Sequence, residues 1–136
     1  FLRAQMPGME LRDAVEADAG RLAELTDAPR DVMRNLVHDR TVRVAEREEE
    51  IVGFVSYDAR AQTVHVTQIE GDPDTFPPLL EEPLGFARAE GMAVEMLVPD
   101  GEPDVEDAAI AAGFEETGSG PRFEGQPTTR LRTDSP

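Results

Sequence analysis

Three segments in the middle of the chain alternate apolar and polar residues with the two-residue period of a β-strand. They are residues 41–45, 51–57 and 63–69, and only short polar turns separate them. Strands joined by such short turns pair as antiparallel neighbours, because parallel strands need a long crossover between them. The sequence therefore predicts a three-stranded antiparallel meander at the centre of the chain.

Helix-like and strand-like segments flank this meander on both sides. Before it, the pattern predicts a strand and two helices, at residues 9–12, at 13–25 and from Pro29 onward. After it, helices and strands alternate, at residues 76–90, 93–98, 104–112, 114–117 and 123–131. A Gly-Ser-Gly-Pro sequence is expected to turn the chain between the last two strands. Prolines are expected to make the start of helix 76–90 irregular.

This order of elements predicts an α/β fold, with a mixed, mostly antiparallel sheet flanked by about four helices. The chain of 136 residues has the length of one domain. Residues 9–132 are expected to form that domain, after an extension or remnant at residues 1–8 and before a disordered tail at residues 133–136. The start of the chain lacks the apolar stretch of a signal peptide, and no apolar run approaches the ~20 residues that span a bilayer. The expected compartment is the cytoplasm, with no membrane partner.

The charge balance excludes one class of partner. The formal net charge is −16, with 29 acidic residues against 13 basic ones, and every basic residue is an arginine. Nucleic-acid binding through a basic patch is excluded by this balance. Because the acids are spread along the chain, they are typical of the solvated surface of a halophilic protein. An acidic surface that receives a basic partner is the alternative.

The residue types that bind metals are few or scattered. Cysteine is absent, which excludes disulfides, zinc–thiolate sites and cysteine nucleophiles. Two acidic strand-to-helix loops resemble each other, at residues 70–74 and 100–104. Their aspartates are expected to cap the following helices, and a divalent cation is the alternative. His38 and His65 are isolated and are expected to be exposed or structural, so no metal site is predicted.

The order of the elements resembles that of the GNAT superfamily of acyl-CoA-dependent N-acetyltransferases. Residues 10–19 resemble the opening strand and helix of that family, residues 51–55 its third strand, and residues 112–118 the end of its last helix. The resemblance covers roughly residues 9–132. It implies an enzyme that transfers an acetyl group from acetyl-CoA to a small-molecule or protein amine. A homodimer through the late strands is a further expectation.

The resemblance also implies where acetyl-CoA binds. In the family, the pantetheine arm lies in a wedge between the fourth and fifth strands, and the diphosphate lies on the start of the next helix. Here the backbone of Val66 and Thr67 would hold the arm, and the amides of Thr75 and Phe76 would face the phosphates. Gly71 takes the first position of the family's phosphate loop.

Several residues depart from the family pattern. Asp74 and Phe76 stand at the two glycine positions of the phosphate loop, and Asp72 adds a second carboxylate. Carboxylates repel phosphates, and side chains in place of glycines prevent a close approach. Ala109 stands where the family often has the tyrosine that protonates the leaving thiolate. An open wedge would favour the enzyme, whereas a wedge filled by Phe76 would favour a non-catalytic binding or regulatory module that has lost the cofactor site.

Glu70 is the candidate catalytic residue, because the family often has a general base on or after its fourth strand. A solvated loop glutamate is the alternative. Tyr57, the only tyrosine, either reaches the substrate cleft or packs at a strand end. Arg122 either lies in a turn or meets an acidic substrate or a cofactor phosphate. Ser56 has no nearby histidine and aspartate in the sequence, so serine-type catalysis is not expected.

Overall fold

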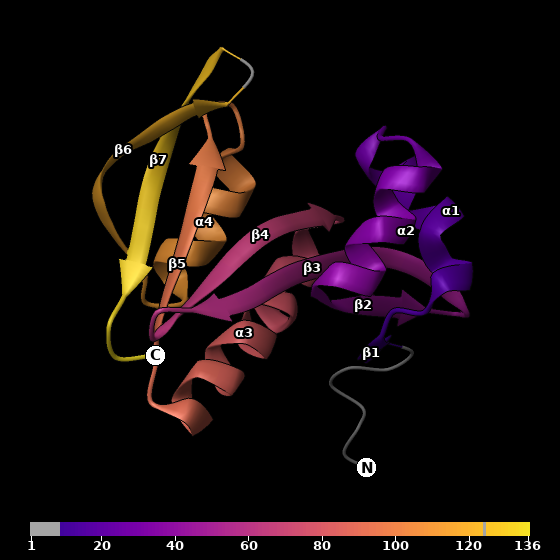
Figure 1. The fold of residues 1–136 in the computed structure, drawn as a ribbon, viewed down its shortest axis with the longest axis horizontal. Coiled ribbons are helices and arrows are strands. Elements are labelled where there is room, and N and C mark those ends of the chain that lie inside the picture. The colour runs from indigo at the N-terminus through magenta and orange to yellow at the C-terminus, as the bar shows by residue number, and fades with distance from the viewer. Residues whose placement is uncertain (1–8, 124) are drawn as a thin grey trace.

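The computed structural model describes residues 9–123 and 125–136, which form one seven-stranded sheet with helices on both faces (Figure 1). The elements in chain order are β1 (Met9–Asp13), η2 (Glu16–Asp18), α1 (Ala19–Thr26), α2 (Arg30–Asp39), β2 (Thr41–Arg47), β3 (Glu50–Arg60), β4 (Thr63–Gly71), η3 (Pro73–Thr75), α3 (Phe76–Glu90), β5 (Ala93–Pro99), α4 (Pro103–Ala111), β6 (Glu115–Phe123) and β7 (Gln126–Thr133). The strands lie in the order β1-β2-β3-β4-β5-β7-β6. Only β4 and β5 are parallel, and the other neighbouring strands are antiparallel.

The central meander and the α/β class are confirmed. β2, β3 and β4 pair in succession as antiparallel strands, and β1 pairs with the outer edge of β2. The short polar turns between these strands use residues with positive φ, such as Glu49 (φ 68°) and Gln62 (φ 63°). The long connection through α3 then brings β5 alongside β4 in parallel, as a crossover helix does.

Two apolar cores lie on opposite faces of the sheet. On one face, α1 and α2 cover β2 and β3, with Leu22 and Met33 packed against Phe54. On the other face, α3 and α4 cover β4 and β5, with Leu80 and Val105 in the larger core. Figure 1 shows the first pair of helices near β2 and β3 and the second pair near β4 and β5.

The first helix starts later than its apolar spacing predicts. The prediction placed a helix over residues 13–25, but Asp13 ends β1 and a 3₁₀ turn, η2, precedes α1. The Asp18 carboxylate accepts the backbone N–H of Val15 at 2.8 Å and is held by Arg12 from β1 at 3.0 Å. These two contacts hold the chain in a tight turn, so the α-helix begins only at Ala19.

We expect Asp18→Asn to lower the free energy of unfolding by about 1 kcal/mol at neutral pH, because it removes a charge-assisted hydrogen bond. Burial alone would raise the pKa of Asp18, but the hydrogen bonds from Arg12 and Val15 outweigh it and lower that pKa. The contribution is therefore present above the unfolded-state pKa and is lost as the pH falls through the folded one. Urea denaturation between pH 7 and pH 2 measures this.

The matched control for this prediction is Asp31→Asn. Asp31 is an exposed acid that pairs with Arg34 one helical turn away, at 3.1 Å. Exposed pairs of this kind contribute at most about 0.5 kcal/mol. An equal loss of stability in both variants would contradict the role given to Asp18.

The Gly-Ser-Gly-Pro sequence does not form a turn, so that prediction is wrong. Gly118, Ser119 and Gly120 pair with β7 inside β6, and the register shifts on both sides of them. A Cβ on Gly120 would lie 2.6 Å from the Leu97 side chain. These glycines therefore allow β6 to be irregular and bulged and to lie close to its neighbours. Glycines inside strands commonly have this role, as an alternative to forming a turn.

The prolines of α3 are accommodated without ending the helix. Pro77 and Pro78 occupy its first turn, where backbone N–H groups have no acceptor within the helix. A 3₁₀ turn, η3, precedes them, which agrees with the predicted irregular start. Pro83 lies inside the helix and is buried against the sheet. Within the described ranges, no helix combines the length and apolar character needed to cross a membrane.

Candidate functional site

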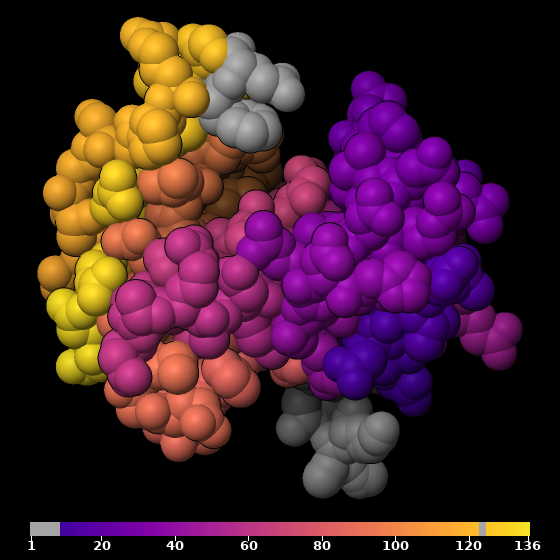
Figure 2. All heavy atoms as spheres, viewed as in Figure 1, coloured from indigo at the N-terminus to yellow at the C-terminus, as the bar shows by residue number. Residues whose placement is uncertain are grey.

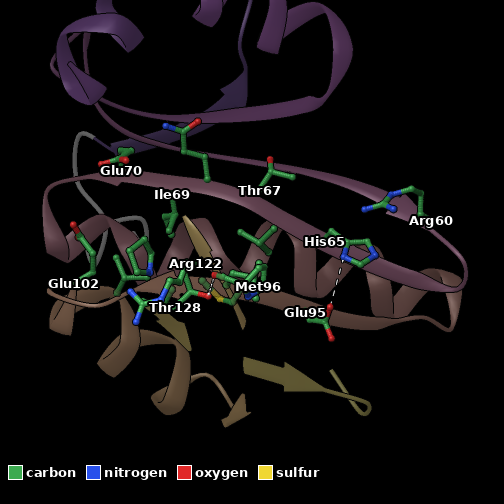
Figure 3. Close-up of a pocket in the computed structure, with 17 residues that line it drawn as sticks. Arg60, His65, Thr67, Ile69, Glu70, Glu95, Met96, Glu102, Arg122 and Thr128 are labelled. Carbon is green, nitrogen blue, oxygen red and sulfur yellow. Dashed lines mark hydrogen bonds and ion pairs between the residues drawn. The ribbon is translucent and has the colours of Figure 1, made fainter. Parts of the chain in front are cut away.

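The parallel strands β4 and β5 separate after four paired positions. Their register runs from Thr63 with Ala93 to Val66 with Met96, and no pairing follows. β4 nevertheless continues to Gly71. A cavity of about 510 Å³ lies between the diverging strands, within the usual range for small-molecule sites (Figure 3).

A β-bulge in β4 lies where the strands begin to separate. Along β3, Tyr57 pairs with Val66 and Ser56 pairs with Gln68, so Thr67 has no partner in β3. The Thr67 hydroxyl instead contacts the buried Ser56 hydroxyl at 2.7 Å. A bulge bends and twists its strand, and here it turns β4 away from β5.

The cavity has apolar walls and two polar ends. The apolar residues come from both strands and from the start of α4, and they are Val66, Ile69, Met96, Leu97, Val98 and Val105. Figure 3 shows Glu70 and Glu102 at one end, and Arg60, His65 and Glu95 at the other. The β6–β7 hairpin contributes Pro121, Arg122 and Thr128. In Figure 2 the surface is hollowed between this hairpin, in orange and yellow, and the violet helices α1 and α2.

Glu70 is the carboxylate whose protonation this cavity most affects. Burial raises the pKa of Glu70, and the negative charge of Glu102 adds to this, while a hydrogen bond with Gln68 works in the opposite direction. The balance is a raised pKa, which makes the ionised carboxylate a stronger base than a solvated one. Glu70 lies near the end of β4 and Glu102 lies in the loop after β5, and Figure 3 shows both at the same end of the cavity.

At the opposite end, Glu95 is already engaged by two arginines and lies near His65. Its carboxylate lies 3.4 Å from Arg130, 3.3 Å from Arg132 and 3.9 Å from His65. These residues come from β4, β5 and β7, which are adjacent in the sheet. Glu95 is therefore held as a structural anion of the sheet, and Glu70 is left as the carboxylate with an altered pKa in the cavity.

The predicted site residues divide into two groups. Val66, Thr67 and Glu70 line the cavity. Thr75 and Phe76 are buried and, together with Gly71, are absent from the cavity lining. The N–H of Thr75 donates to the Asp72 carbonyl at 2.9 Å, and the N–H of Phe76 donates to the Pro73 carbonyl. Both amides are therefore used inside η3.

Gly71 is required by the packing of the sheet. Its φ is +129°, and a Cβ there would overlap the Cα of Gly53 and the carbonyl oxygen of Val52. Asp72, the next residue, donates its N–H to the same Val52 carbonyl at 2.9 Å. The glycine thus allows β4 to end directly against β3, which accounts for it without a ligand.

The wedge is open, because Phe76 does not fill it. The Phe76 side chain is only 5% exposed and belongs to the core under α3. Ala109 is fully buried in the same core. Tyr57 packs against Phe86 of α3, with ring centroids 6.1 Å apart, and is not among the residues of the cavity. The packing alternative therefore holds, although Tyr57 lies within β3 and not at its end. Of the two alternatives weighed for the wedge, the structure has the open one.

Sequence reasoning missed Glu102 and most of the apolar wall. Glu102 lies in the loop at residues 100–104. The likeness of this loop to the one at residues 70–74, which begins with Glu70, could have pointed to Glu102 as a second site residue. Both loops follow parallel strands, and the carboxyl ends of parallel strands lie at one edge of a sheet, where ligands bind. Among residues 9–123 and 125–136, no three histidine, aspartate or glutamate side chains converge as a metal site.

The overall fold is that of the GNAT family of acetyltransferases, as comparison with solved structures shows. The yncA protein of Salmonella typhimurium, solved with its cofactor acetyl-CoA, has a TM-score of 0.77 and 16% identity and covers 95% of both chains. The ribosomal-protein-alanine N-acetyltransferase of Brucella melitensis has a TM-score of 0.75 and 19% identity, over 91% of this chain and 98% of that one. SpeG spermidine N-acetyltransferase of Vibrio cholerae has a TM-score of 0.73 and 16% identity, over 93% of both chains.

Sequence comparison adds nothing to this structural likeness, because neither a protein-family model nor a curated protein matches the chain. The agreement over nearly the full length of each compared structure confirms the fold that the order of elements predicted.

Proposed function

We propose that this protein is an N-acyltransferase that takes an acetyl group from the thioester of acetyl-CoA and delivers it to an amine. The open wedge between β4 and β5 is the observation that carries this proposal. A wedge is costly for a sheet, because it leaves backbone groups of two adjacent strands without ladder partners. Its persistence here favours a ligand that supplies those partners.

The pantetheine arm of the donor matches what the wedge offers. The arm is uncharged and has two amide groups, so it pairs with a strand edge as a peptide does. Beyond Val66, the β5-facing edge of β4 has no strand partner. Val98 and Val105 supply apolar wall opposite that edge. We therefore assign the arm to the edge of β4 that follows Val66 and begins with Thr67.

The bound donor supplies an activated acyl group, whose bond to sulfur breaks as a bond to the amine nitrogen forms. The amine must lose a proton for this, and the thiolate must gain one. Glu70 is placed to accept the proton, because it lines the cavity and its pKa is raised by burial. Ala109 cannot donate a proton, so the thiolate takes its proton from water or from the acidic form of Glu70.

The acceptor is proposed to be a primary amine of a small molecule or protein. The compared structures include a spermidine acetyltransferase and a ribosomal-protein-alanine acetyltransferase, so the fold serves both kinds of amine. We propose a cytoplasmic location for this reaction. A homodimer through the late strands stays a prediction.

A non-catalytic binding or regulatory module is the second candidate. It is favoured by Ala109, which leaves no tyrosine on α4, and by the start of α3, where Thr75 and Phe76 use their amides internally. A module of this kind would bind a donor or a related metabolite in the wedge without transferring an acyl group.

A transfer assay with a panel of amines distinguishes these candidates. We expect acetyl-CoA to acetylate at least one polyamine, amino acid or peptide amine in the panel, with release of one thiol for each amide formed. Thiol release without amide would be hydrolysis and would contradict the proposal. Calorimetric binding of acetyl-CoA and acetyl-pantetheine, with no turnover of any amine in the panel, would favour the module.

A further inference from the structure

We propose that this protein recognises its donor through the uncharged pantetheine thioester arm alone and makes no use of the donor's diphosphate. The ligand class is therefore an acyl-pantetheine thioester, whether free or as the arm of acyl-CoA. This inference rests on the proposed function, because it concerns how the same wedge selects its donor. Three independent features of the strand ends support it.

The first feature is a lack of backbone donors where α3 begins. A diphosphate at a helix start is normally held by free N–H groups. Pro73, Pro77 and Pro78 have no N–H at all. The N–H groups of Thr75 and Phe76 are used within η3. This leaves the start of α3 without the donor cluster that a diphosphate requires.

The second feature is the charge at this end of the wedge. Asp72 and Asp74 precede α3, and Arg47, the cation beside them, is already paired with both, at 3.9 Å and 3.1 Å. At the start of α4, Asp104 and Glu106 occupy the first turn. The start of α4 therefore already has carboxylates in its first turn, and two aspartates that share one arginine precede the start of α3. A diphosphate placed there would meet repulsion rather than a positive dipole end.

The third feature concerns Gly71, the only glycine in the loop at residues 70–74. The packing of the sheet accounts for this glycine, and the approach of a ligand is not needed to explain it. A glycine in a phosphate loop is expected to have open space where a Cβ would be, into which a phosphate fits. The Cβ position of Gly71 is filled by Gly53 and Val52 of β3. The backbone here therefore lies against the sheet, and not against a cavity.

In contrast, the cavity has two features that suit an uncharged arm with amide groups. The cavity walls are apolar, and β4 has an unpaired edge beside them. Arg122 is the cation of the β6–β7 hairpin that lines this cavity, and it donates to the Gly125 carbonyl at 2.8 Å. Together with Arg60, which lines the other end of the cavity, it provides an alternative position for a phosphate that the experiment must address.

The test compares the dissociation constants of acetyl-pantetheine and acetyl-CoA by calorimetry at 0.1 M and 1 M KCl. We expect the two ligands to bind within about threefold of each other at 1 M KCl, where charge repulsion is screened. At 0.1 M KCl we expect acetyl-CoA to bind several-fold more weakly than acetyl-pantetheine. Binding of acetyl-CoA should thus strengthen with salt, which is opposite to a site that holds phosphates by positive charge.

Charge variants sharpen this test. The double variant Asp72→Asn, Asp74→Asn should strengthen acetyl-CoA binding at 0.1 M KCl and leave acetyl-pantetheine binding unchanged. Asp31→Asn, an exposed acid on α2, is the control with a charge change away from the wedge. Arg122→Gln should change neither affinity by more than about twofold, since a single exposed charge contributes little.

Three outcomes are distinguishable. Binding of acetyl-CoA at least tenfold tighter than that of acetyl-pantetheine, and weakened by salt, would overturn the inference. If Arg122→Gln then abolished this difference in affinity, the phosphates would be assigned to the β6–β7 hairpin. Binding of the two ligands within about threefold at 1 M KCl, with acetyl-CoA the weaker ligand at 0.1 M KCl, supports the inference. If neither acetyl-pantetheine nor acetyl-CoA binds, the proposed function itself is overturned, and this inference with it.

Discussion

Replacing Glu70 by glutamine is expected to lower the rate of acyl transfer by about 100- to 1,000-fold, the usual contribution of a positioned general base. Donor affinity should change little, because the glutamine keeps the shape of the side chain and the wedge. The measurement is steady-state transfer with a fixed amine, together with calorimetric binding of acetyl-pantetheine. A large loss of rate without a loss of binding identifies proton transfer as the step that Glu70 serves.

The pH profile supplies a readout that a structural role would not change. In the wild-type protein, kcat/KM should rise with pH as Glu70 ionises, and burial places that rise above the pH of an ordinary glutamate. The rise should disappear in Glu70→Gln, while any limb that belongs to the amine acceptor stays in both proteins. Glu102→Gln is the matched control, because it removes the neighbouring charge that raises the pKa of Glu70. The acidic limb should then move to lower pH, with activity at neutral pH kept within about threefold, since pair interactions of this kind are modest.

The stability of Glu70→Gln has a defined direction. Because the folded protein raises the pKa of Glu70, the folded state binds its proton more readily than the unfolded chain does. This acid therefore favours folding less as the pH rises, and the uncharged glutamine should leave the melting temperature at neutral pH equal to or above that of the wild type. Full activity in Glu70→Gln would exclude Glu70 as the base, and an unfolded variant would contradict this reasoning on stability.

The substitution Gly71→Ala is expected to lower the free energy of unfolding by about 3 kcal/mol, a large part of the 5–15 kcal/mol of a typical domain. The φ of +129° is unfavourable for any residue with a Cβ, and the added methyl would overlap backbone atoms of Gly53 and Val52. Backbone cannot move aside as a side chain can, so the end of β4 must separate from β3. Urea denaturation measures the loss.

Gly91→Ala is the control for backbone conformation alone. Gly91 ends α3 with a φ of +70°, and nothing lies within 4 Å of the position of its Cβ. Alanine there should cost about 1 kcal/mol, the ordinary penalty for a left-handed residue. Equal losses of unfolding free energy in the two variants would show that the overlap of the added methyl with β3 adds nothing to the penalty for the backbone conformation. Because Gly71 follows Glu70 directly, a displaced strand end should also lower the transfer rate in any Gly71→Ala protein that stays folded.

The meander and the long helix show what local sequence can predict. Residues 63–69 alternate apolar and polar side chains, and the structure has β4 there. Residues 76–90 were predicted as a helix, and α3 has the same bounds. In both cases the side-chain period within one segment determines its structure, and no distant contact is needed to assign it.

The misplaced elements have a common cause. The start of α1 is delayed because Arg12, on a strand, holds Asp18 in a tight turn. The glycines at 118 and 120 belong to a bulged strand that pairs with β7, where Gly118 has a φ of +141° and Leu97 and Thr128 lie directly against Gly120. Closely spaced glycines indicate an unusual backbone conformation. Whether that conformation is a turn or a bulge depends on the neighbouring strand.

The sequence by itself determined the class of fold, the position of Glu70 at the end of the fourth strand and the acidity of the loops, because these follow from residue type and local period. The tertiary structure alone decided that the wedge is open and that Phe76 lies in the core. It also decided that the amides of Thr75 and Phe76 are consumed within η3. These features depend on which strand separates from which neighbour and at which residue, and they arise from contacts between segments far apart in the chain.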